Sequence, residues 1–163
     1  MKSTLILIDF DHTLFNTTRF KKELKEGRKR FNYRKFLYPD SKKFISYATK
    51  YGTPTLFSEG DVNFQKNKII KTGMKDFFGV NIKIYPSSLE IGKMDKINKL
   101  AANYQKVILI DDKPEIVSKA LALDYKVIRV KRGKYREIKT AIHPTFEVEN
   151  LKEIIRQDLL SDI

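Results

Sequence analysis

The chain has 163 residues, of which 33 are lysine or arginine and 20 are aspartate or glutamate, so its formal net charge is +13; it contains no cysteine. This length suits one domain with a real core, and the lack of cysteine excludes a disulfide framework and a thiolate metal site. No apolar stretch reaches the roughly 18 residues of a membrane span, and the first apolar run ends in acidic residues instead of a signal-peptide cleavage site. We therefore expect a single domain over residues 1–163 of a cytoplasmic protein that has no membrane partner.

Five short apolar runs predict strands that are buried on both faces, at residues 4–8, 53–57, 80–85, 107–110 and 125–130. Segments with apolar residues at helical spacing alternate with these runs, at residues 44–48, 62–70, 94–101, 116–123 and 151–160. Strands that alternate with helices predict right-handed crossovers and an α/β fold, with a parallel sheet covered by helices on both faces. Residues 19–43 interrupt the alternation, so we expect a small basic insertion over about residues 16–40, after the first strand.

The positive charge is concentrated in two segments. Residues 19–43 hold eleven basic and three acidic residues, and residues 126–139 hold seven basic residues and one acidic residue. Because these two segments account for the whole excess, they predict a localised positive field and an anionic partner. The alternative is a solvated helix face and a solvated loop without a ligand.

Polar and charged side chains stand at the points where the predicted strands end. Asp9 and Asp11 follow the first strand, Ser58 follows the second, and Asp111 and Asp112 follow the fourth. Ligands bind at the carboxyl ends of the strands in parallel α/β sheets, so we expect these side chains to surround one crevice. Aspartate and serine also cap helices, which is the structural alternative for each position taken singly. Their joint occurrence at strand ends favours a site.

These residue types fit phosphoryl transfer. Carboxylates from neighbouring strand ends repel one another unless a cation lies between them, and oxygen ligands without histidine or cysteine favour Mg²⁺. Asp9 can act as the nucleophile and form an aspartyl-phosphate, while Asp11 can protonate the leaving oxygen and then activate water. Ser58 can donate to a phosphate oxygen, and Lys93, with Lys96 as a second candidate, can neutralise phosphate charge.

The sequence resembles the haloacid dehalogenase-like (HAD) superfamily, whose four motifs occur here in the family's order, over nearly the whole chain. The motifs are LILIDFDHTLF with Asp9, Asp11 and Thr13, TLFSEGD with Ser58, IGKMDKI with Lys93, and VILIDDKPE with Asp111 and Asp112. The first and fourth motifs are specific, whereas the second and third each depend on a single residue.

The resemblance implies a Rossmann-like fold, a Mg²⁺ cofactor and a role for each matching residue. Asp9 would be the nucleophile and a metal ligand, and Asp11 would be the acid and base and would also ligate through its backbone carbonyl. Asp112 takes the position of the family's metal-binding acid, and Asp111 would ligate directly or through water. His12 stands where glycine is commoner, so it alters the turn, touches substrate or is a bystander.

The expected function is a Mg²⁺-dependent phosphomonoesterase that acts through an aspartyl-phosphate, because true dehalogenases of the superfamily lack an acid at the position of Asp11. The short insertion after the first strand predicts a minimal helical cap and an open site. The rivals are a phosphomutase or phosphotransferase on the same scaffold and a non-enzymatic nucleic-acid-binding module. The order of the motifs excludes a phospho-accepting receiver domain.

The expected substrate is anionic: a nucleotide, a polynucleotide end or a sugar phosphate. Thr13 and Gly60, together with Ser58 and Lys93, are the candidate substrate-binding residues near the strand ends. Four basic residues of the charged segments are candidates for a positive rim around the crevice: Arg28, Arg30, Lys131 and Arg132. Exposed aromatic rings of the first basic segment could stack on nucleobases, whereas buried rings would only pack the insertion onto the body.

Overall fold

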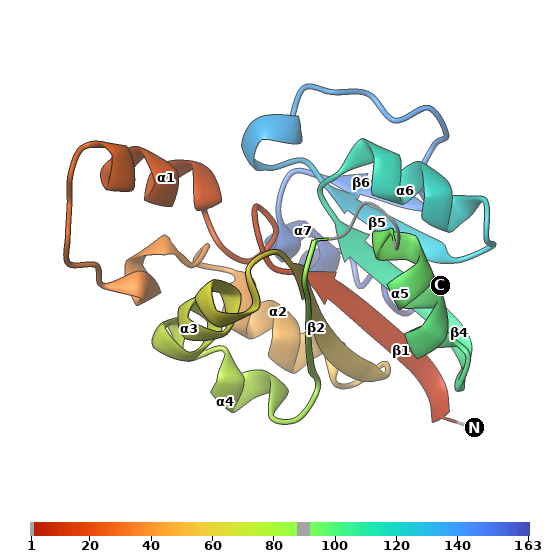
Figure 1. Cartoon of the computed structure of the whole chain (residues 1–163). Coiled ribbons are helices and arrows are strands. Elements are labelled where there is room, and N and C mark those ends of the chain that lie inside the picture. The colour runs from red at the N-terminus through yellow and green to blue at the C-terminus, as the bar shows by residue number, and fades with distance from the viewer. Residues whose placement is uncertain (1, 88–91) are drawn as a thin grey trace.

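The computed structural model describes residues 2–87 and 92–163, which contain one six-stranded sheet with the strand order β3-β2-β1-β4-β5-β6 (Figure 1). The strands are Lys2–Asp9 (β1), Thr53–Glu59 (β2), Ile82–Tyr85 (β3), Tyr104–Asp111 (β4), Lys126–Val130 (β5) and Phe146–Val148 (β6). Every neighbouring pair is parallel. The predicted Rossmann-like α/β architecture is confirmed, and all strand carboxyl ends share one edge.

The α-helices of the described ranges are α1 (Thr17–Lys25), α2 (Ser41–Ala48), α3 (Val62–Thr72), α4 (Lys75–Phe78), α5 (Lys93–Ala101), α6 (Pro114–Leu121) and α7 (Leu151–Arg156). Two 3₁₀ helices are η1 (Tyr33–Phe36) and η2 (Gly133–Tyr135). Helices α5 and α6 cover one face of the sheet, and α2, α3, α4 and α7 cover the other (Figure 1). None of these helices is long and apolar enough to cross a membrane.

The alternation of side chains along β1 divides the core into two layers. Leu5 and Leu7 pack with residues of α5 and α6, whereas Ile6 and Ile8 pack with residues of α2, α3 and α7. All four side chains are at most 1% exposed, as the continuous apolar run predicted. Burying one such side chain contributes roughly 1.5–3 kcal/mol, so the strand that ends in Asp9 is firmly anchored.

Several elements differ from the sequence-based predictions. Helix α4 was not predicted, and β4 begins at Tyr104, three residues earlier than expected. Strand β6 was not predicted, because it is only three residues long and is defined by its pairing with β5, in which Phe146 lies opposite Ile128. Strand β3 begins two residues later than expected, since Val80 is 91% exposed in the turn after α4. Helix α7 ends at Arg156 and is followed by turns instead of continuing to residue 160.

The segment between β1 and α2 contains α1 and η1, and aromatic packing attaches it to the body. Phe20 of α1 and Phe36 of η1 are buried against Phe15, with ring centroids 5.5 and 5.8 Å from that of Phe15. Phe31 joins them from the connecting loop, 5.0 Å from Phe20. Phe20 and Phe36 are therefore largely occupied by packing, whereas Phe31 is half-buried. The role of this segment as a cap stays a prediction.

Candidate active site

The loop after β1 brings two carboxylates to the carboxyl edge of the sheet. Asp9 is the last residue of β1 and is 6% exposed. The chain then turns tightly, with a hydrogen bond of 3.0 Å from the Leu14 N–H to the carbonyl of the buried Phe10. His12 has a φ of 66° in this turn, a conformation that glycine adopts at no steric cost. Asp11, two residues after Asp9, lines a pocket at this edge of the sheet.

Lys93 connects the ends of β1 and β4. It is the first residue of α5, whose start is fixed by a hydrogen bond of 3.0 Å from the Gly92 N–H to Asp95 Oδ2. Its ammonium group lies 2.7 Å from Asp9 Oδ1 and 2.6 Å from Asp111 Oδ2. Burial by itself would lower the pKa of Lys93, but the two carboxylates outweigh burial and raise that pKa above its usual range. The lysine therefore stays charged.

The second lysine candidate, Lys96, is engaged elsewhere. It pairs with Glu59 at 3.1 Å and donates to the Pro86 carbonyl at 2.8 Å. Of the two lysines between which the sequence left the choice open, Lys93 is the one that contacts Asp9 and Asp111.

Asp9, Asp111 and Asp112 form a buried acidic cluster in which carboxylate oxygens of all three lie within 4.8 Å of one another. Among the residues that the structure describes, none hydrogen-bonds to Asp9 Oδ2 or to either carboxylate oxygen of Asp112. Burial raises the pKa of Asp9 and of Asp112 above the usual carboxyl range. For Asp112 the charges of Asp9 and Asp111 raise the pKa further, and for both residues the charge of Lys93 opposes the shift. Buried oxygens without partners need a proton or a cation, and an all-oxygen set suits Mg²⁺. The residues present therefore fit a divalent metal ion.

The two neighbouring aspartates of this cluster differ in what they can still bind. Both oxygens of Asp111 are occupied, since Lys93 donates to Oδ2 at 2.6 Å and the Lys113 N–H donates to Oδ1 at 2.8 Å. The carboxylate oxygens of Asp112 carry no such contacts within residues 2–87 and 92–163. Asp112 is therefore better placed than Asp111 to ligate a metal ion directly.

Asp11 is surrounded by hydrogen-bond donors that the sequence did not reveal. Lys68 Nζ and Thr17 Oγ1 each lie 2.5 Å from Asp11 Oδ1, and Gln65 Nε2 lies 2.7 Å from Asp11 Oδ2. Gln65 and Lys68 are three residues apart on α3 and so lie on one side of the helix. Burial would raise the pKa of Asp11, but the Lys68 charge and the hydrogen bonds outweigh it and lower that pKa below its usual range. Asp11 is therefore held as a carboxylate.

Lys68 is buried beneath aromatic rings although it belongs to a lysine-rich helix. It is 2% exposed, and its ammonium group lies 5.2, 4.9 and 5.4 Å from the ring centroids of Phe10, Phe15 and Phe64. The other lysines of α3, Lys66 and Lys71, are exposed, so the sequence alone makes Lys68 look like a surface residue. The available signal was its position one helical turn after Phe64.

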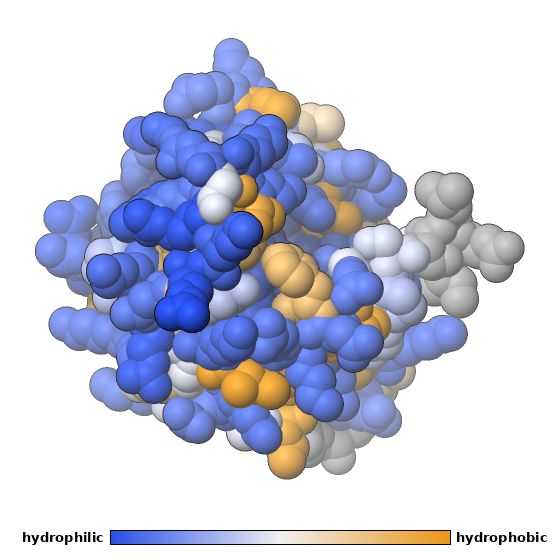
Figure 2. Space-filling view, turned by 60° about the vertical axis from the view of Figure 1, so that its left-hand side comes forward, coloured by the Kyte–Doolittle hydropathy of each residue, from blue (hydrophilic) through white to orange (hydrophobic). Residues whose placement is uncertain are grey.

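A pocket of about 400 Å³ opens beside Asp11, between the β1 loop, α1, α3, the junction of β4 with α6, and η2. Its basic lining residues are Lys21, Lys68, Lys113 and Lys134, and its aromatic lining residues are Phe20, Phe64 and Tyr135. The side of the molecule that is on the left in Figure 1, with α1 and α3, comes forward in Figure 2, where hydrophilic side chains dominate the surface.

His12 joins the β1 loop to η2 in the wall of this pocket. Burial lowers the pKa of His12 to about 4; Asp11 opposes this shift, and the charges of three pocket lysines reinforce it. The ring is therefore neutral at pH 7. Gly133 of η2 lies against it with a φ of 59°, and a Cβ atom there would lie 2.1 Å from His12 Nδ1. His12 thus helps to hold η2 against the β1 loop.

The other predicted substrate-binding residues at the strand ends differ in what they offer. Ser58 is buried on β2, one residue beyond Phe57, the partner of Asp9 across the two strands. Thr13 is buried in the β1 loop, where no described residue hydrogen-bonds to its Oγ1. Gly60 uses its N–H for a hydrogen bond of 2.9 Å to the Tyr85 carbonyl, so that N–H is not free for a phosphate.

Arg132 has a structural position instead of the predicted place on a basic rim. Its guanidinium group is buried, donates to the Thr13 carbonyl at 2.8 Å and pairs with Asp40. It also lies 4.1 Å from the centroid of the Tyr38 ring. Its donors are committed to holding the β1 loop against the start of α2, so they do not project into the pocket.

The other three predicted rim residues also lie outside the pocket lining. Lys131 pairs with Glu149 at 3.1 Å, and Arg28 pairs with Glu23 on the exposed side of α1. Arg30 is exposed in the loop between α1 and η1. The two basic segments do meet at the pocket, but through lysines other than these four residues, since α1 contacts η2.

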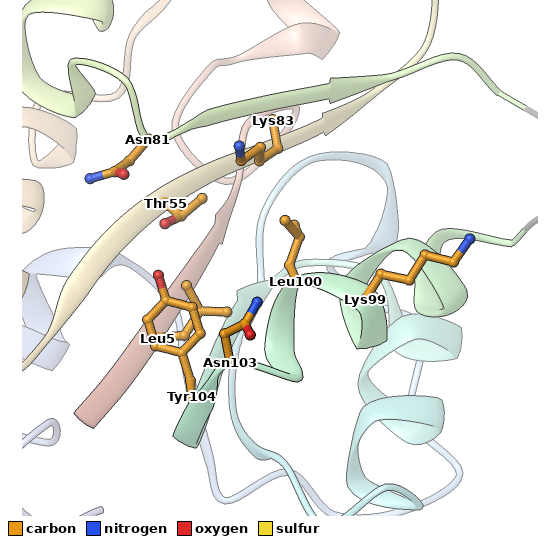
Figure 3. Close-up of a pocket in the computed structure, with 8 residues that line it drawn as sticks. All are labelled: Leu5, Thr55, Asn81, Lys83, Lys99, Leu100, Asn103 and Tyr104. Atoms are coloured by element: carbon orange, nitrogen blue, oxygen red, sulfur yellow. The ribbon is translucent and has the colours of Figure 1, made fainter. Parts of the chain in front are cut away.

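A larger hollow of about 770 Å³ lies beside α5, toward the amino ends of the strands (Figure 3). Its lining residues are Leu5, Thr55, Asn81, Lys83, Lys99, Leu100, Asn103 and Tyr104. No carboxylate is among them, so this hollow lacks the acid, base and metal-binding groups that phosphoryl transfer needs.

No family model matches this sequence, and no curated protein matches it. Among solved structures, a Burkholderia xenovorans protein assigned as a haloacid dehalogenase-like hydrolase is similar over 100% of both chains, at 16% identity and a TM-score of 0.80. A Bacillus subtilis protein assigned as a HAD hydrolase, with magnesium bound, covers 96% of this chain and 99% of its own, at 14% identity and a TM-score of 0.66. The L-2-haloacid dehalogenase of Xanthobacter autotrophicus covers 96% and 98%, at 13% identity and a TM-score of 0.63. These similarities establish the fold, and the chemistry has to be argued from the site.

Proposed function

We propose that this chain, which has the fold of the haloacid dehalogenase-like hydrolases, is a Mg²⁺-dependent phosphomonoesterase that works through an aspartyl-phosphate on Asp9. The proposal depends on one observation, the presence of two acidic residues, Asp9 and Asp11, at the end of β1. Asp9 faces the acidic cluster with one oxygen lacking a partner, and Asp11 faces the adjoining pocket as a carboxylate. The dehalogenases that the sequence resembles lack this second acid, so Asp11 favours phosphate as the group transferred.

Asp9 and Asp112 would hold the metal ion through their partnerless carboxylate oxygens, and the resemblance adds the backbone carbonyl of Asp11. Asp111 would act as a positioning residue, because its oxygens already bind Lys93 and the Lys113 N–H. A bound Mg²⁺ would offset the negative charge of the cluster and of the phosphate oxygens.

In the first half of the reaction, a carboxylate oxygen of Asp9 attacks phosphorus and the bond from phosphorus to the leaving oxygen breaks. The leaving oxygen takes a proton from Asp11. Asp11 is ionised in the free protein, so it first takes up a proton from solvent or from a monoanionic phosphate ester, which the negative charge of the bound phosphate favours by raising its pKa. Lys93 keeps Asp9 in place throughout, and Ser58, beside Asp9, can donate to a phosphate oxygen.

In the second half, water attacks the phosphorus of the aspartyl-phosphate. Asp11 accepts a proton from this water, and the bond between phosphorus and the Asp9 oxygen breaks. Inorganic phosphate is released and Asp9 is restored as a carboxylate; Asp11 carries the proton, which it returns to solvent once the phosphate has left. The contacts of Asp11 with Lys68, Thr17 and Gln65 keep its carboxylate aimed at the pocket.

The test is phosphate release from p-nitrophenyl phosphate, measured with Mg²⁺ and with EDTA on the wild type, Asp9→Asn and the control Asp124→Asn. Asp124 is an exposed residue with a φ of 60°, a conformation that asparagine tolerates, and it lies outside the site. We expect Mg²⁺-dependent turnover in the wild type and in the control, and a loss of about 10³-fold or more in Asp9→Asn.

Two results would contradict the proposal. Full activity of a folded Asp9→Asn protein would exclude the covalent mechanism. Failure of the folded wild type to release phosphate with Mg²⁺ would exclude a general phosphomonoesterase. It would favour a phosphotransferase that needs its own acceptor, or a binding module whose nucleic-acid affinity falls steeply with salt.

A further inference from the structure

Three lysines from three separate elements converge on the pocket beside Asp11. Lys21 comes from α1, Lys113 precedes α6, and Lys134 belongs to η2. Lys21 and Lys134 are exposed at the pocket, whereas Lys113 is half-buried. The sequence separates these residues widely, so the folding of the chain, and not a local run of charge, brings them together.

The acidic residues of the same pocket do not neutralise these three lysines. Asp11 pairs with Lys68 at 2.5 Å, and Glu59 pairs with Lys96 at 3.1 Å. No described carboxylate forms an ion pair with any of the three pocket lysines, which are Lys21, Lys113 and Lys134.

Only some of the other charges in the basic segments are compensated, and those without an ion pair to a described carboxylate, such as Lys25 and Lys126, do not line this pocket. Lys131 pairs with Glu149 at 3.1 Å, and Arg132 pairs with Asp40. Three like charges that converge without counter-charges repel one another and oppose folding, so they are better explained by an anionic ligand than by stability.

The three lysines divide according to their distance from the acidic cluster. The charge of Lys113 acts on Asp9 and Asp112, and its backbone N–H binds Asp111, so Lys113 stands nearest to the position of a transferred phosphate. Lys21 and Lys134 line the pocket from α1 and η2, and we place the leaving group of a substrate against these two elements.

We propose that Lys21 and Lys134 form a subsite for a second phosphate on the leaving group, so that the substrates are small bisphosphorylated molecules. This inference rests on the proposed phosphomonoesterase function. A pocket of about 400 Å³ is within the usual size range of small-molecule sites. Phe64, which is 44% exposed, and Tyr135 offer ring surface for the body of such a molecule. A nucleoside bisphosphate and a sugar bisphosphate share this chemistry.

The test compares substrates that differ by one phosphate. Its nucleoside arm sets adenosine 3′,5′-bisphosphate against adenosine 3′- and 5′-monophosphate, and its sugar arm sets fructose 1,6-bisphosphate against fructose 1- and 6-phosphate. We expect kcat/KM for the bisphosphate to exceed that for the better monophosphate by about 10-fold or more in at least one arm, as one charged contact can supply. The arm with the larger ratio identifies the source of the second phosphate.

The variants are Lys21→Ala/Lys134→Ala and a matched control, Lys25→Ala/Lys126→Ala. The control removes the same total charge from α1 and from the exposed start of β5, outside the pocket lining. We expect the first variant to reduce the preference for the bisphosphate to within about 2-fold of unity, while the control keeps the wild-type ratio.

A binding measurement separates failure of this inference from failure of the proposed function. The same ligands are titrated calorimetrically into Asp9→Asn, which cannot turn over by the proposed route, with and without the two subsite substitutions. Tighter binding of a bisphosphate than of its monophosphates, lost with the subsite substitutions and kept with the control substitutions, supports the subsite even if the wild type shows no turnover. Equal binding of bisphosphate and monophosphate in both arms overturns the inference, even if p-nitrophenyl phosphate is hydrolysed.

Discussion

Replacing Asp112 by asparagine should stabilise the metal-free protein and abolish its response to Mg²⁺. Asp112 is fully buried, and neither of its carboxylate oxygens has a hydrogen-bond partner in the described part of the chain. Asparagine keeps the shape, removes one negative charge and places an amide donor near the partnerless Asp9 Oδ2. The same change removes a metal ligand, so stability and metal binding should move in opposite directions.

The magnitude follows from the geometry of the cluster. Two unit charges 4.8 Å apart, the outer limit within the cluster, repel by about 3 kcal/mol at an effective dielectric constant of about 20. Asp112 faces two such charges, on Asp9 and Asp111, and the ammonium group of Lys93 offsets about one of them. The net gain on removing the Asp112 charge is therefore about 3 kcal/mol, which corresponds to a rise in Tm of roughly 6–12 °C.

The pH dependence has a definite sign. The pKa of Asp112 is raised in the folded state, so its charge destabilises the fold only when pH exceeds the ordinary carboxyl pKa of about 4. The advantage of asparagine should be near zero at pH 4 and grow as pH rises, to at most about 4 kcal/mol at pH 7. Below pH 4 the Asp112 side chain is neutral in both the folded and the unfolded state, so the stability difference between the wild type and Asp112→Asn vanishes.

The assay is thermal unfolding in EDTA and in Mg²⁺ over this pH range, on the wild type, Asp112→Asn and the exposed control Asp124→Asn. Mg²⁺ at 100 times its dissociation constant should stabilise the wild type and the control by about 2.7 kcal/mol and leave Asp112→Asn unchanged. The reasoning is refuted if Asp112→Asn is less stable than the wild type in EDTA at pH 7, or if Mg²⁺ stabilises both proteins equally.

Two further substitutions test the surroundings of Asp11. Gly133→Ala should destabilise the protein by about 2–4 kcal/mol in urea unfolding, because its Cβ would lie 2.1 Å from His12 Nδ1 at a φ of 59°. His12→Gly should recover most of that loss, and a double variant no more stable than Gly133→Ala would contradict the proposed contact. Lys68→Met should lower kcat on p-nitrophenyl phosphate at pH 7 by about 10-fold or more. It should also raise the pKa of Asp11, so the limb of the pH–rate profile that reports Asp11 should move to higher pH. Lys68→Arg should restore the wild-type profile in part, whereas identical profiles for all three proteins would deny Lys68 a positioning role.

Asp11 was predicted from the sequence, but the residues that hold its carboxylate in place were not. Asp11 was identified from its position two residues after Asp9, because the end of a buried parallel strand is where ligands bind. Lys68 and Gln65, which hold it, were not identified. Helix α3 reads as a lysine-rich surface helix, and only its packing over Phe10 shows that one of its lysines is desolvated.

The sequence by itself determined the alternation of β1 to β5 with helices, the burial of β1 on both faces and the acids at the strand ends. These depend on local periodicity and on the rule that parallel strands present their carboxyl ends at one edge. Only the tertiary structure decided that Lys93 and not Lys96 contacts Asp9, that Arg132 is internal, and which lysines remain without counter-charges. Ion pairing and desolvation depend on which distant elements pack together, and no local pattern of residues specifies that.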